Sequence, residues 1–402
     1  MRKEMKWAAG IARGPRLGGL VSEAAAAIRS QIQDSPVDLC LAFVSPHFRD
    51  GYTHLHGMVQ EHLPTRVFAG CSAVGVIASG LEFEEEPALT LVAARLPDVE
   101  VRALYTHALD LPDMDASPDL WRCWLGETEP DRKGFVLLAN PGAPGLEKLL
   151  SGLDYAYPAV PKVGGLASGG KMEERALFEG PRVFNSGVLL INFGGAIEMD
   201  TMVAQGCRPI GRPLAITRCE KNHVLEVDGQ PPLHYLSELV EQSNEADRNL
   251  MRSALFVGLQ PDDPAFDSRG EYLIRNLVGV DYKRGILAVG AGLSNGQLLR
   301  FHLRDRASSA TMLDEALDRY RRHAAGRAPC VALFFSCVGR GRNLYGTANH
   351  ESDLFARHFP AVPVGGFFCS GEIGPACGNT HIHTFTSAFA LFRPPARQDD
   401  IL

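Results

Sequence analysis

The chain has 402 residues, of which 45% are hydrophobic and 22% are charged, and its formal net charge is -7. At roughly 100–200 residues per domain this length predicts two to four folded units, and the composition excludes wholesale disorder. The apolar runs are shorter than the ~20 residues that span a bilayer, the N-terminus shows no apolar signal segment, and the acidic excess argues against nucleic acid as a partner. We therefore predict a cytoplasmic protein that is not inserted in a membrane.

Apolar periodicity predicts elements along the whole chain, in addition to the repeated units described below. The helices are expected over residues 17–33, 117–125, 231–242 and 308–322. The third of these helices begins at prolines, and Leu233, Leu236 and Val240 are expected to face inward. A hairpin is predicted over 272–290, and the acidic segments 81–87 and 112–119 are expected to be solvated loops.

Three segments share one pattern, in which an apolar strand, a crossover of roughly two dozen residues, a glycine-rich hinge and a closing strand follow one another. The opening strands are residues 39–45, 135–141 and 330–337, and the closing strands are residues 88–96, 186–194 and 387–394. Such alternation of strands and crossovers predicts an α/β fold, with α+β as the alternative. We expect mixed sheets flanked by helices, in two tandem related halves at 1–196 and 197–395, followed by a tail at 396–402.

The three hinges read GCSAVG, GGLASGG and GGFFCSGEIG. Glycines after a strand allow backbone N–H groups to approach an anion or polar ligand closely, but they also permit tight turns and close packing of layers. Two sets of glycines are expected to be equivalent, the second only if the third copy carries one inserted residue. These sets are Gly70, Gly164 and Gly365, and Gly75, Gly169 and Gly371.

Side chains that could bind a ligand or take part in catalysis are most frequent between residues 336 and 384. This segment begins at the carboxyl end of a strand, where open α/β folds tend to bind ligands. If the last strand begins near Thr380, His381 and His383 share one face of it with Phe385. The candidate side chains of this region are Cys337, Arg340, Cys369, Ser370, Glu372, His381 and His383.

These side chains allow three functional interpretations and one purely structural interpretation. In a small-ligand pocket, Arg340 and backbone N–H groups would hold a carboxylate, and Glu372 an amine or hydroxyl. In an enzyme, a thiol of Cys337 or Cys369 would be the nucleophile, activated by a nearby histidine and arginine. A zinc site matches no familiar ligand spacing, so we predict neither a metal nor a cofactor. The structural alternative is buried cysteines, a capped turn and surface histidines. The nine cysteines include no CxxC pair and are expected to be reduced thiols.

Several longer motifs together resemble the FIST domain, in both its N-terminal and C-terminal parts. They are VGGLASGG, VAQGCRPIG, VLEVDGQPPL, YLIRNLVGVD, SCVGRG and GGFFCSGEIGP. The resemblance covers nearly the whole chain and implies a sensory module of bacterial signal transduction that binds small ligands such as amino acids; it also extends to F-box proteins of eukaryotic ubiquitin ligases. The signature positions carried over are Gly164, Gly165, Gly169, Gly206, Arg208, Pro209, Gly211, Ser336, Cys337, Gly339, Arg340, Gly365, Gly366, Gly371, Glu372 and Gly374.

From the residues and the resemblance we predict a sensory protein whose ligand is an amino acid or a small carboxylate, and which signals through a separate downstream protein. The expected ligand-binding residues are Ser336, Cys337, Arg340, Gly366, Cys369, Ser370, Glu372, His381 and His383. A cysteine-dependent enzyme that uses Cys337 or Cys369 is the first alternative. An adaptor that binds another protein through the acidic segments 81–87 and 112–119 is the second.

Overall fold

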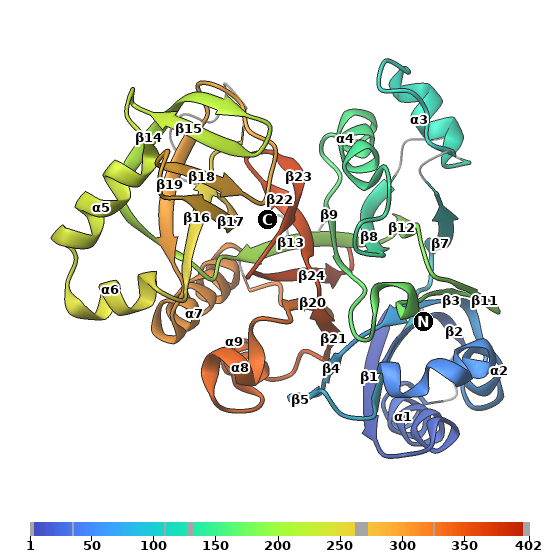
Figure 1. Cartoon of the computed structure of the whole chain (residues 1–402). Coiled ribbons are helices and arrows are strands. Elements are labelled where there is room, and N and C mark those ends of the chain that lie inside the picture. Colours follow the sequence, from blue (N-terminus) through green and yellow to red (C-terminus); the bar gives the residue numbers. More distant parts are fainter. Residues whose placement is uncertain are drawn as a thin grey trace.

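The computed structural model describes residues 4–33, 36–107, 110–126, 132–261, 272–324 and 326–396. Within these residues the strands form three six-stranded sheets and a closed six-stranded barrel (Figure 1). The first sheet contains, in spatial order, β1 (Lys6–Arg13), β6 (Ala88–Arg95), β2 (Val37–Val44), β3 (Thr65–Ser72), β10 (Leu177–Glu179) and β11 (Arg182–Phe184). The second contains β7 (Val99–Thr106), β12 (Val188–Gly195), β8 (Arg132–Ala139), β9 (Lys162–Leu166), β22 (Glu372–Ala376) and β23 (Asn379–His383). The third contains β13 (Glu198–Ala204), β24 (Ser387–Arg393), β20 (Val331–Cys337), β21 (Val364–Cys369), β4 (Gly75–Ala78) and β5 (Leu81–Glu84).

The three sheets have one topology, which reveals three repeats in the chain. In each sheet an outer strand pairs antiparallel with the closing strand, the closing strand pairs antiparallel with the opening strand, and the opening strand pairs parallel with the hinge strand. The first repeat runs from β1 to β6, the second from β7 to β12, and the third from β13 to β24. The predicted mixed α/β architecture is thereby confirmed.

In each repeat, the short hairpin that follows the hinge strand pairs with the hinge strand of a different repeat. The hairpin β4–β5 of the first repeat pairs with β21 of the third, β22–β23 of the third pairs with β9 of the second, and β10–β11 of the second pairs with β3 of the first. The exchange is therefore cyclic, and every sheet is completed by a hairpin from another repeat.

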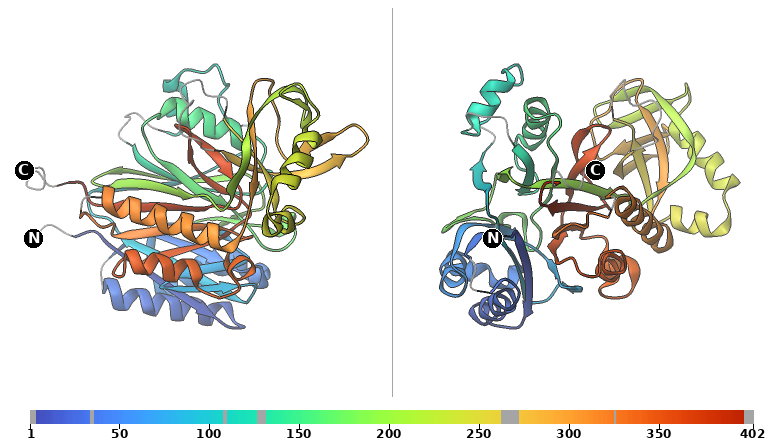
Figure 2. Two further views of the ribbon diagram at one scale, coloured as in Figure 1. Left: turned by 90° about the vertical axis from the view of Figure 1, so that its left-hand side faces the viewer. Right: turned by 180° about the vertical axis from the view of Figure 1, so that it is seen from behind.

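Helices cover the outer face of each sheet, as the views in Figure 2 show. The sheets are consequently buried on both faces, which explains why their strands are almost continuously apolar. The helices are α1 (Leu17–Ile32), η1 (Pro46–Gly51) and α2 (Tyr52–His62) in the first repeat, α3 (Pro118–Trp124), α4 (Leu146–Ala156) and η3 (Met172–Glu174) in the second, and α7 (Arg306–His323), α8 (Gly341–Tyr345) and α9 (His350–His358) in the third.

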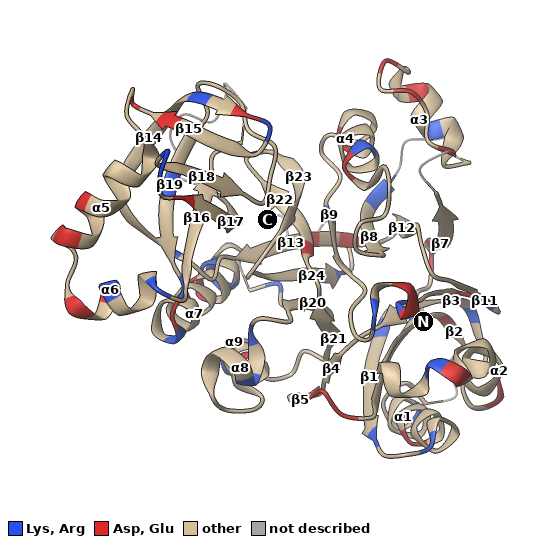
Figure 3. Cartoon of the chain, viewed as in Figure 1, with Lys and Arg blue, Asp and Glu red and all other residues tan. Residues whose placement is uncertain are grey.

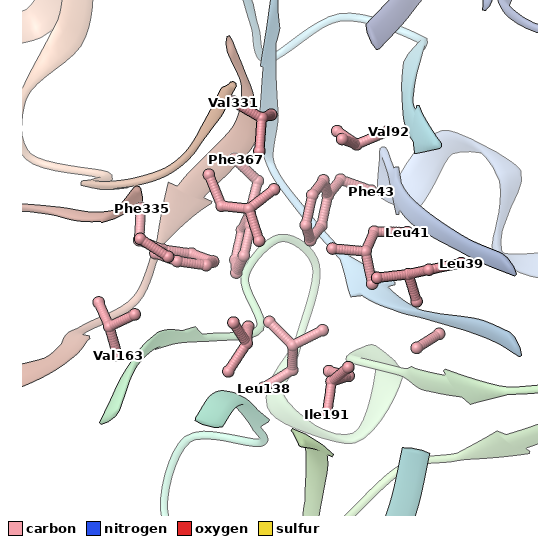
Figure 4. Packing of buried hydrophobic residues seen from close by; sticks show 14 of the residues in the cluster. Leu39, Leu41, Phe43, Val92, Leu138, Val163, Ile191, Val331, Phe335 and Phe367 are labelled. Atoms are coloured by element: carbon pink, nitrogen blue, oxygen red, sulfur yellow. The ribbon is translucent and has the colours of Figure 1, made fainter. Parts of the chain in front are cut away.

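The inner faces of the three sheets enclose a common apolar core. Figure 4 shows side chains of all three sheets pointing toward one another, among them Phe43, Leu138 and Phe335. The rings of Phe43 and Phe367 stack with their centroids 4.7 Å apart and so join the first sheet to the third. The three repeats therefore share one core and pack as one body.

The barrel is inserted in the third repeat, between β13 and α7. Its strands are, in order around the barrel, β14 (Arg208–Glu220), β15 (His223–Val227), β18 (Ile286–Val289), β17 (Leu273–Asp281), β16 (Leu255–Leu259) and β19 (Leu298–Leu303). Two helices, α5 (Pro232–Gln242) and α6 (Glu245–Met251), belong to this insertion. No described helix is long and apolar enough to cross a membrane.

Most predicted elements are present, and three details differ. The acidic segment 81–87 is in part the strand β5, whose Glu82 is buried. The last strand does not run on from Thr380, because β23 and β24 belong to different sheets and Phe385 between them has a φ of 63°. In α5, Val240 is exposed and Leu239 packs against the barrel core instead.

Candidate ligand site where the three hinges meet

The hinge strands of the three repeats contain a glycine at one common position. A Cβ atom on Gly70, Gly164 or Gly366 would lie 2.0, 1.8 or 1.7 Å from a backbone carbonyl oxygen of the neighbouring parallel strand, so no side chain fits there. The third member of this set is thus Gly366, and the expectation of Gly365 was wrong. Counting five residues onward from each member reaches Gly75, Gly169 and Gly371, without any insertion.

The hydroxyl group of Ser168 joins the three hinges. Its Oγ accepts a hydrogen bond from the backbone N–H of Val74, in the first repeat, at 2.9 Å. It also donates to the backbone carbonyl of Phe368, in the third repeat. The side chain of Ser72 donates in turn to the carbonyl of Ser168 at 3.2 Å. One buried serine of the second repeat therefore holds the hinges of the other two.

A pocket of about 360 Å³ opens where these hinges meet, and we call it the hinge pocket. Ligand-binding pockets of proteins commonly have volumes of roughly 300–1,000 Å³. The hinge pocket is lined by Val74, Gly75, Glu84, Glu85, Ser168, Gly169, Gly170, Arg175, Val338, Asn343, Phe368 and Ser370. All three repeats contribute to it, in part from the residues that follow their hinge strands.

The hinge pocket combines one cation with two carboxylates. Arg175 lies among the lining residues, and its Nε is buried without a hydrogen-bond partner in the described part of the chain. Burial lowers the pKa of Arg175 from its ordinary value. Glu84 accepts hydrogen bonds at 2.9 and 3.1 Å from the backbone N–H of Arg342, and burial raises the pKa of Glu84. Figure 3 shows the acidic residues of β5 and of the turn that follows it in red.

Arg340 lies outside the hinge pocket and is occupied by internal partners. Its side chain is fully buried and meets the equally buried carboxylate of Glu351 at 2.6 Å. Its remaining nitrogens donate to the hydroxyl of Tyr345 at 2.6 Å and to the carbonyl of Phe385 at 3.1 Å. Ser336 donates to the same carboxylate of Glu351 at 2.5 Å. The structure therefore surrounds Arg340 and Ser336 with a buried polar network instead of an open ligand site.

The two candidate thiols lie in the interior. Cys337 and Cys369 are neighbours across the parallel pair β20–β21, and both are buried. Burial raises the pKa of Cys337 to about 12 and that of Cys369 well above its ordinary value. A reactive cysteine needs a thiolate in a partly exposed, electropositive environment, which neither residue has.

Glu372 is also fully buried, at the start of β22. One of its carboxyl oxygens accepts hydrogen bonds from the backbone N–H and the hydroxyl of Thr386, at 3.1 and 2.8 Å, and the other has no partner in the described residues. Burial raises the pKa of Glu372 to about 8, so the carboxyl group is largely protonated at neutral pH.

The two histidines of β23 face different surroundings. His383 is buried, its Nε2 lies 3.1 Å from the carbonyl of Gly374, and burial lowers its pKa to about 3. His381 lines a separate pocket beside the barrel. Within the described residues no group of three or more His, Cys, Asp or Glu side chains is placed to hold a metal ion.

Of the nine predicted ligand-binding residues, the structure places only Ser370 in the lining of the hinge pocket. Phe368 and Val338, which belong to two of the predicted motifs, accompany it. Sequence reasoning missed Arg175, although it lies only five residues beyond Gly170, at the end of a predicted hinge. Three charged residues, Lys171, Glu173 and Glu174, lie between the hinge and Arg175, so the sequence gives no signal that selects Arg175. It also missed Glu84, because the acidic segment was expected to be a solvated loop.

Comparison with known proteins identifies the family. The FIST N domain matches residues 38–230 and the FIST C domain matches residues 232–375. An uncharacterized protein of Mycobacterium tuberculosis is 30% identical over 390 residues, which are 96% of this chain and 100% of that protein. F-box only protein 22 of Homo sapiens is 36% identical over 73 residues, which are 18% of each chain.

Among solved structures, the cyanuric acid hydrolase from A. caulinodans aligns over 98% of this chain and 100% of its own, with 9% identity and a TM-score of 0.36. FIST domains are small-ligand sensory domains. With both of its domains matched in order along the sequence, the chain belongs to the FIST family.

Proposed function

We propose that this protein is a small-ligand sensor whose ligand, an amino acid or a small carboxylate, binds in the hinge pocket. The observation that carries the proposal is the position of Arg175, whose buried Nε has no partner in the described residues and which lines a pocket built by all three hinges. Burying part of a guanidinium without an acceptor is unfavourable, so an anionic ligand would relieve this cost.

The carboxylate of the ligand is assigned to Arg175. A guanidinium presents several N–H donors in one plane and can hold a carboxylate by two parallel hydrogen bonds, which are stronger than neutral ones. Hydrogen bonds to charged groups contribute about 1.5–3 kcal/mol each. In this proposal Arg175 takes the role that the sequence had suggested for Arg340.

The opposite end of the ligand is assigned to Glu84 and Glu85, which line the same pocket. Glu84 already accepts the N–H of Arg342, but a carboxylate has about four acceptor positions and can accept an ammonium group as well. The hydroxyl of Ser370 supplies a further donor or acceptor. An α-amino acid, with one carboxylate and one ammonium group, matches this distribution of charge.

Ligand binding in the hinge pocket would act on the packing of the three repeats. Since the lining residues come from three repeats, a ligand that contacts them all stabilises one mutual arrangement of the repeats. We propose that a separate downstream protein reads this arrangement, in the cytoplasm.

The two alternatives receive less support. The enzyme hypothesis requires a thiolate, and burial raises the pKa of both Cys337 and Cys369. The adaptor hypothesis requires exposed acidic segments. Residues 112–119 are largely exposed, but Glu82 within 81–87 is buried and accepts hydrogen bonds from Ser352.

A thermal-shift titration with the twenty amino acids and small mono- and dicarboxylates tests the proposal. A ligand that binds only the folded state raises the melting temperature, and the rise grows with the ratio of ligand concentration to Kd. We expect at least one of these compounds to stabilise the wild-type protein and the control variant Arg182→Gln, whose arginine is exposed on β11. We expect the variant Arg175→Gln to bind the same compound at least tenfold more weakly. Equal binding by Arg175→Gln, or stabilisation by none of the compounds, would contradict the proposal.

A further inference from the structure

A second pocket, of about 510 Å³, lies where the barrel meets the second repeat, and we call it the barrel-side pocket. It is bordered by α4 of the second repeat, by β23 of the third, and by β17 of the barrel. Its lining residues are Glu147, Leu150, Ser151, Asp154, Tyr155, Arg275, Asn379, Thr380, His381 and Ile382. None of them lines the hinge pocket.

Two walls of this pocket are fixed to each other by Asp154. Its carboxylate accepts hydrogen bonds from the backbone N–H and the hydroxyl of Thr380, at 2.6 and 2.7 Å, and pairs with Lys162 at 3.0 Å. The negative charge of Asp154 is therefore already neutralised. The third wall is held as well, because Thr384 donates to the carbonyl of Ile274, at the start of β17, at 2.8 Å.

Arg275 brings a positive charge to the pocket, which Glu147 balances only at longer range. Its Nη1 donates to the carbonyl of Ile274 at 2.9 Å, but no carboxylate of the described residues lies within 4 Å of its guanidinium nitrogens. The Arg275 side chain is half-buried, and burial lowers the pKa of Arg275 from its ordinary value. A guanidinium in such a position favours an anionic partner.

On β23, His381 supplies a polar ring nitrogen that has no partner among the described residues. Its Nε2 is buried and has no hydrogen-bond partner in the described residues. Buried polar atoms in native proteins are nearly always hydrogen-bonded, so an unpartnered one that lines a pocket indicates a missing ligand or water. Arg275 and His381 are close enough for the charge of Arg275 to lower the pKa of His381 further.

We infer that the barrel-side pocket is a second ligand site, which binds the oxyanion of a small molecule, a carboxylate or a phosphate group, between Arg275 and His381. The guanidinium of Arg275 binds two oxygens of the anion, and the Nε2 of His381 donates to a third atom of the ligand. The exposed Glu147 lies at the rim, where it can accept a hydrogen bond from a hydroxyl or ammonium group of the same ligand. A molecule bound here touches the barrel and two repeats at once.

Titration calorimetry of the full chain with inorganic phosphate and with succinate, each against sodium chloride at equal ionic strength, tests this site. We expect saturable binding of at least one probe, and which one binds distinguishes a phosphate ligand from a carboxylate ligand. The variant Arg275→Gln is expected to weaken this binding at least tenfold. The matched control Arg284→Gln, exposed on the hairpin that follows β17, is expected to bind as the wild type does.

A further variant covers the case in which Arg275→Gln fails to fold. Ser151 is an exposed residue of α4 in the pocket lining, so Ser151→Trp is expected to fold and to block the pocket. Arg175→Gln, in the hinge pocket, should leave the binding of phosphate unchanged, which separates this site from the carboxylate site proposed at Arg175. Absence of binding by both probes, or binding that survives both Arg275→Gln and Ser151→Trp, would overturn the inference.

Discussion

The side-chain oxygen of Ser168 lies 2.9 Å from the backbone nitrogen of Val74, and this contact between residues 94 positions apart joins the second repeat to the first. The same oxygen carries the proton that is donated to Phe368 of the third repeat. A hydroxyl group can both donate and accept, whereas a methyl group can do neither. The arrangement of the hinge pocket therefore depends on the chemistry of a single buried oxygen.

Replacing this serine by Ala should destabilise the protein. The variant Ser168→Ala leaves the N–H of Val74 and the carbonyl of Phe368 without their partner, and an unsatisfied buried group costs about 1–3 kcal/mol. Urea denaturation measures this change. The control Ser30→Ala, on the exposed face of α1, should alter stability by less than about 0.5 kcal/mol. Equal stability of the two variants would contradict the assigned role.

Arg340→Ala is expected to damage the fold strongly. The substitution leaves the fully buried carboxylate of Glu351 without its cation, and breaking a buried ion pair in this way costs about 3–5 kcal/mol. The double variant Arg340→Met, Glu351→Leu removes both charges and should recover much of the lost stability. The control Arg342→Ala removes an exposed side chain and should be nearly neutral. Melting temperatures compare the four proteins, and an unchanged value for Arg340→Ala would refute the expectation.

A methyl group on Gly366 is expected to break the third sheet locally. The Cβ atom of Gly366→Ala would lie 1.7 Å from the carbonyl oxygen of Phe334, so β20 and β21 would have to separate. We expect a loss of more than about 4 kcal/mol, or failure to fold. Gly57 in α2 has nothing within 4 Å of its Cβ position, so Gly57→Ala should stabilise by about 0.5–1 kcal/mol. Circular dichroism during urea denaturation measures both effects, and comparable stability of both variants would contradict the proposed close approach.

Alkylation should distinguish the cysteines by their burial. Cys123 is exposed, whereas Cys337 and Cys369 are buried and have raised pKa values. Iodoacetamide at pH 7.5, a pH chosen as roughly one unit below the ordinary thiol pKa, is therefore expected to modify Cys123 first. The two buried thiols should react only after denaturation. Mass spectrometry of the peptides measures the order, and rapid modification of Cys337 or Cys369 in the folded protein would instead support the enzyme hypothesis.

The buried carboxyl group of Glu372 should make stability depend on pH. Its folded-state pKa of about 8 lies above the ordinary value of 4.5, so the folded state binds the proton more tightly than the unfolded state. Stability contributed by this group is complete below pH 4.5 and is lost as the pH rises toward 8, by at most about 1.4 kcal/mol per pH unit. The variant Glu372→Gln, which cannot ionise, should lose less stability than the wild type over this range. Denaturation midpoints at several pH values measure the two slopes, and identical slopes would refute the prediction.

Local patterns predicted the elements but not their exchange between repeats. The helix over 17–33 and the hairpin over 272–290 were predictable, because their periodicity lies within one segment. The strands β10 and β22 contain only three and five residues, and their partners on the neighbouring sheets lie more than a hundred residues away. Such pairing leaves no local signal.

The candidate site could be predicted only in part, for a related reason. The glycine hinges were recognisable, and they do line the pocket at Gly75 and Gly169. The partners of a charged side chain could not be recognised in the sequence, because Arg340 meets Glu351 only when α9 packs beside the hinge. Sequence alone could not distinguish that buried ion pair from a ligand contact, nor show that Arg175 has no ion-pair carboxylate among the residues that the structure describes.

The cyclic exchange of hairpins has a consequence for any division of the polypeptide between β12 and β13. The first fragment would carry β4–β5 without the strand it pairs with, and would leave β9 as an unpaired edge. The second fragment would expose β21 as an edge and would carry the hairpin β22–β23 without β9, the strand with which it pairs. Exposed edges of this kind recruit other strands, which is a route to aggregation. Each fragment, however, holds the hairpin that the other lacks, so the two pieces are built to complement each other in trans.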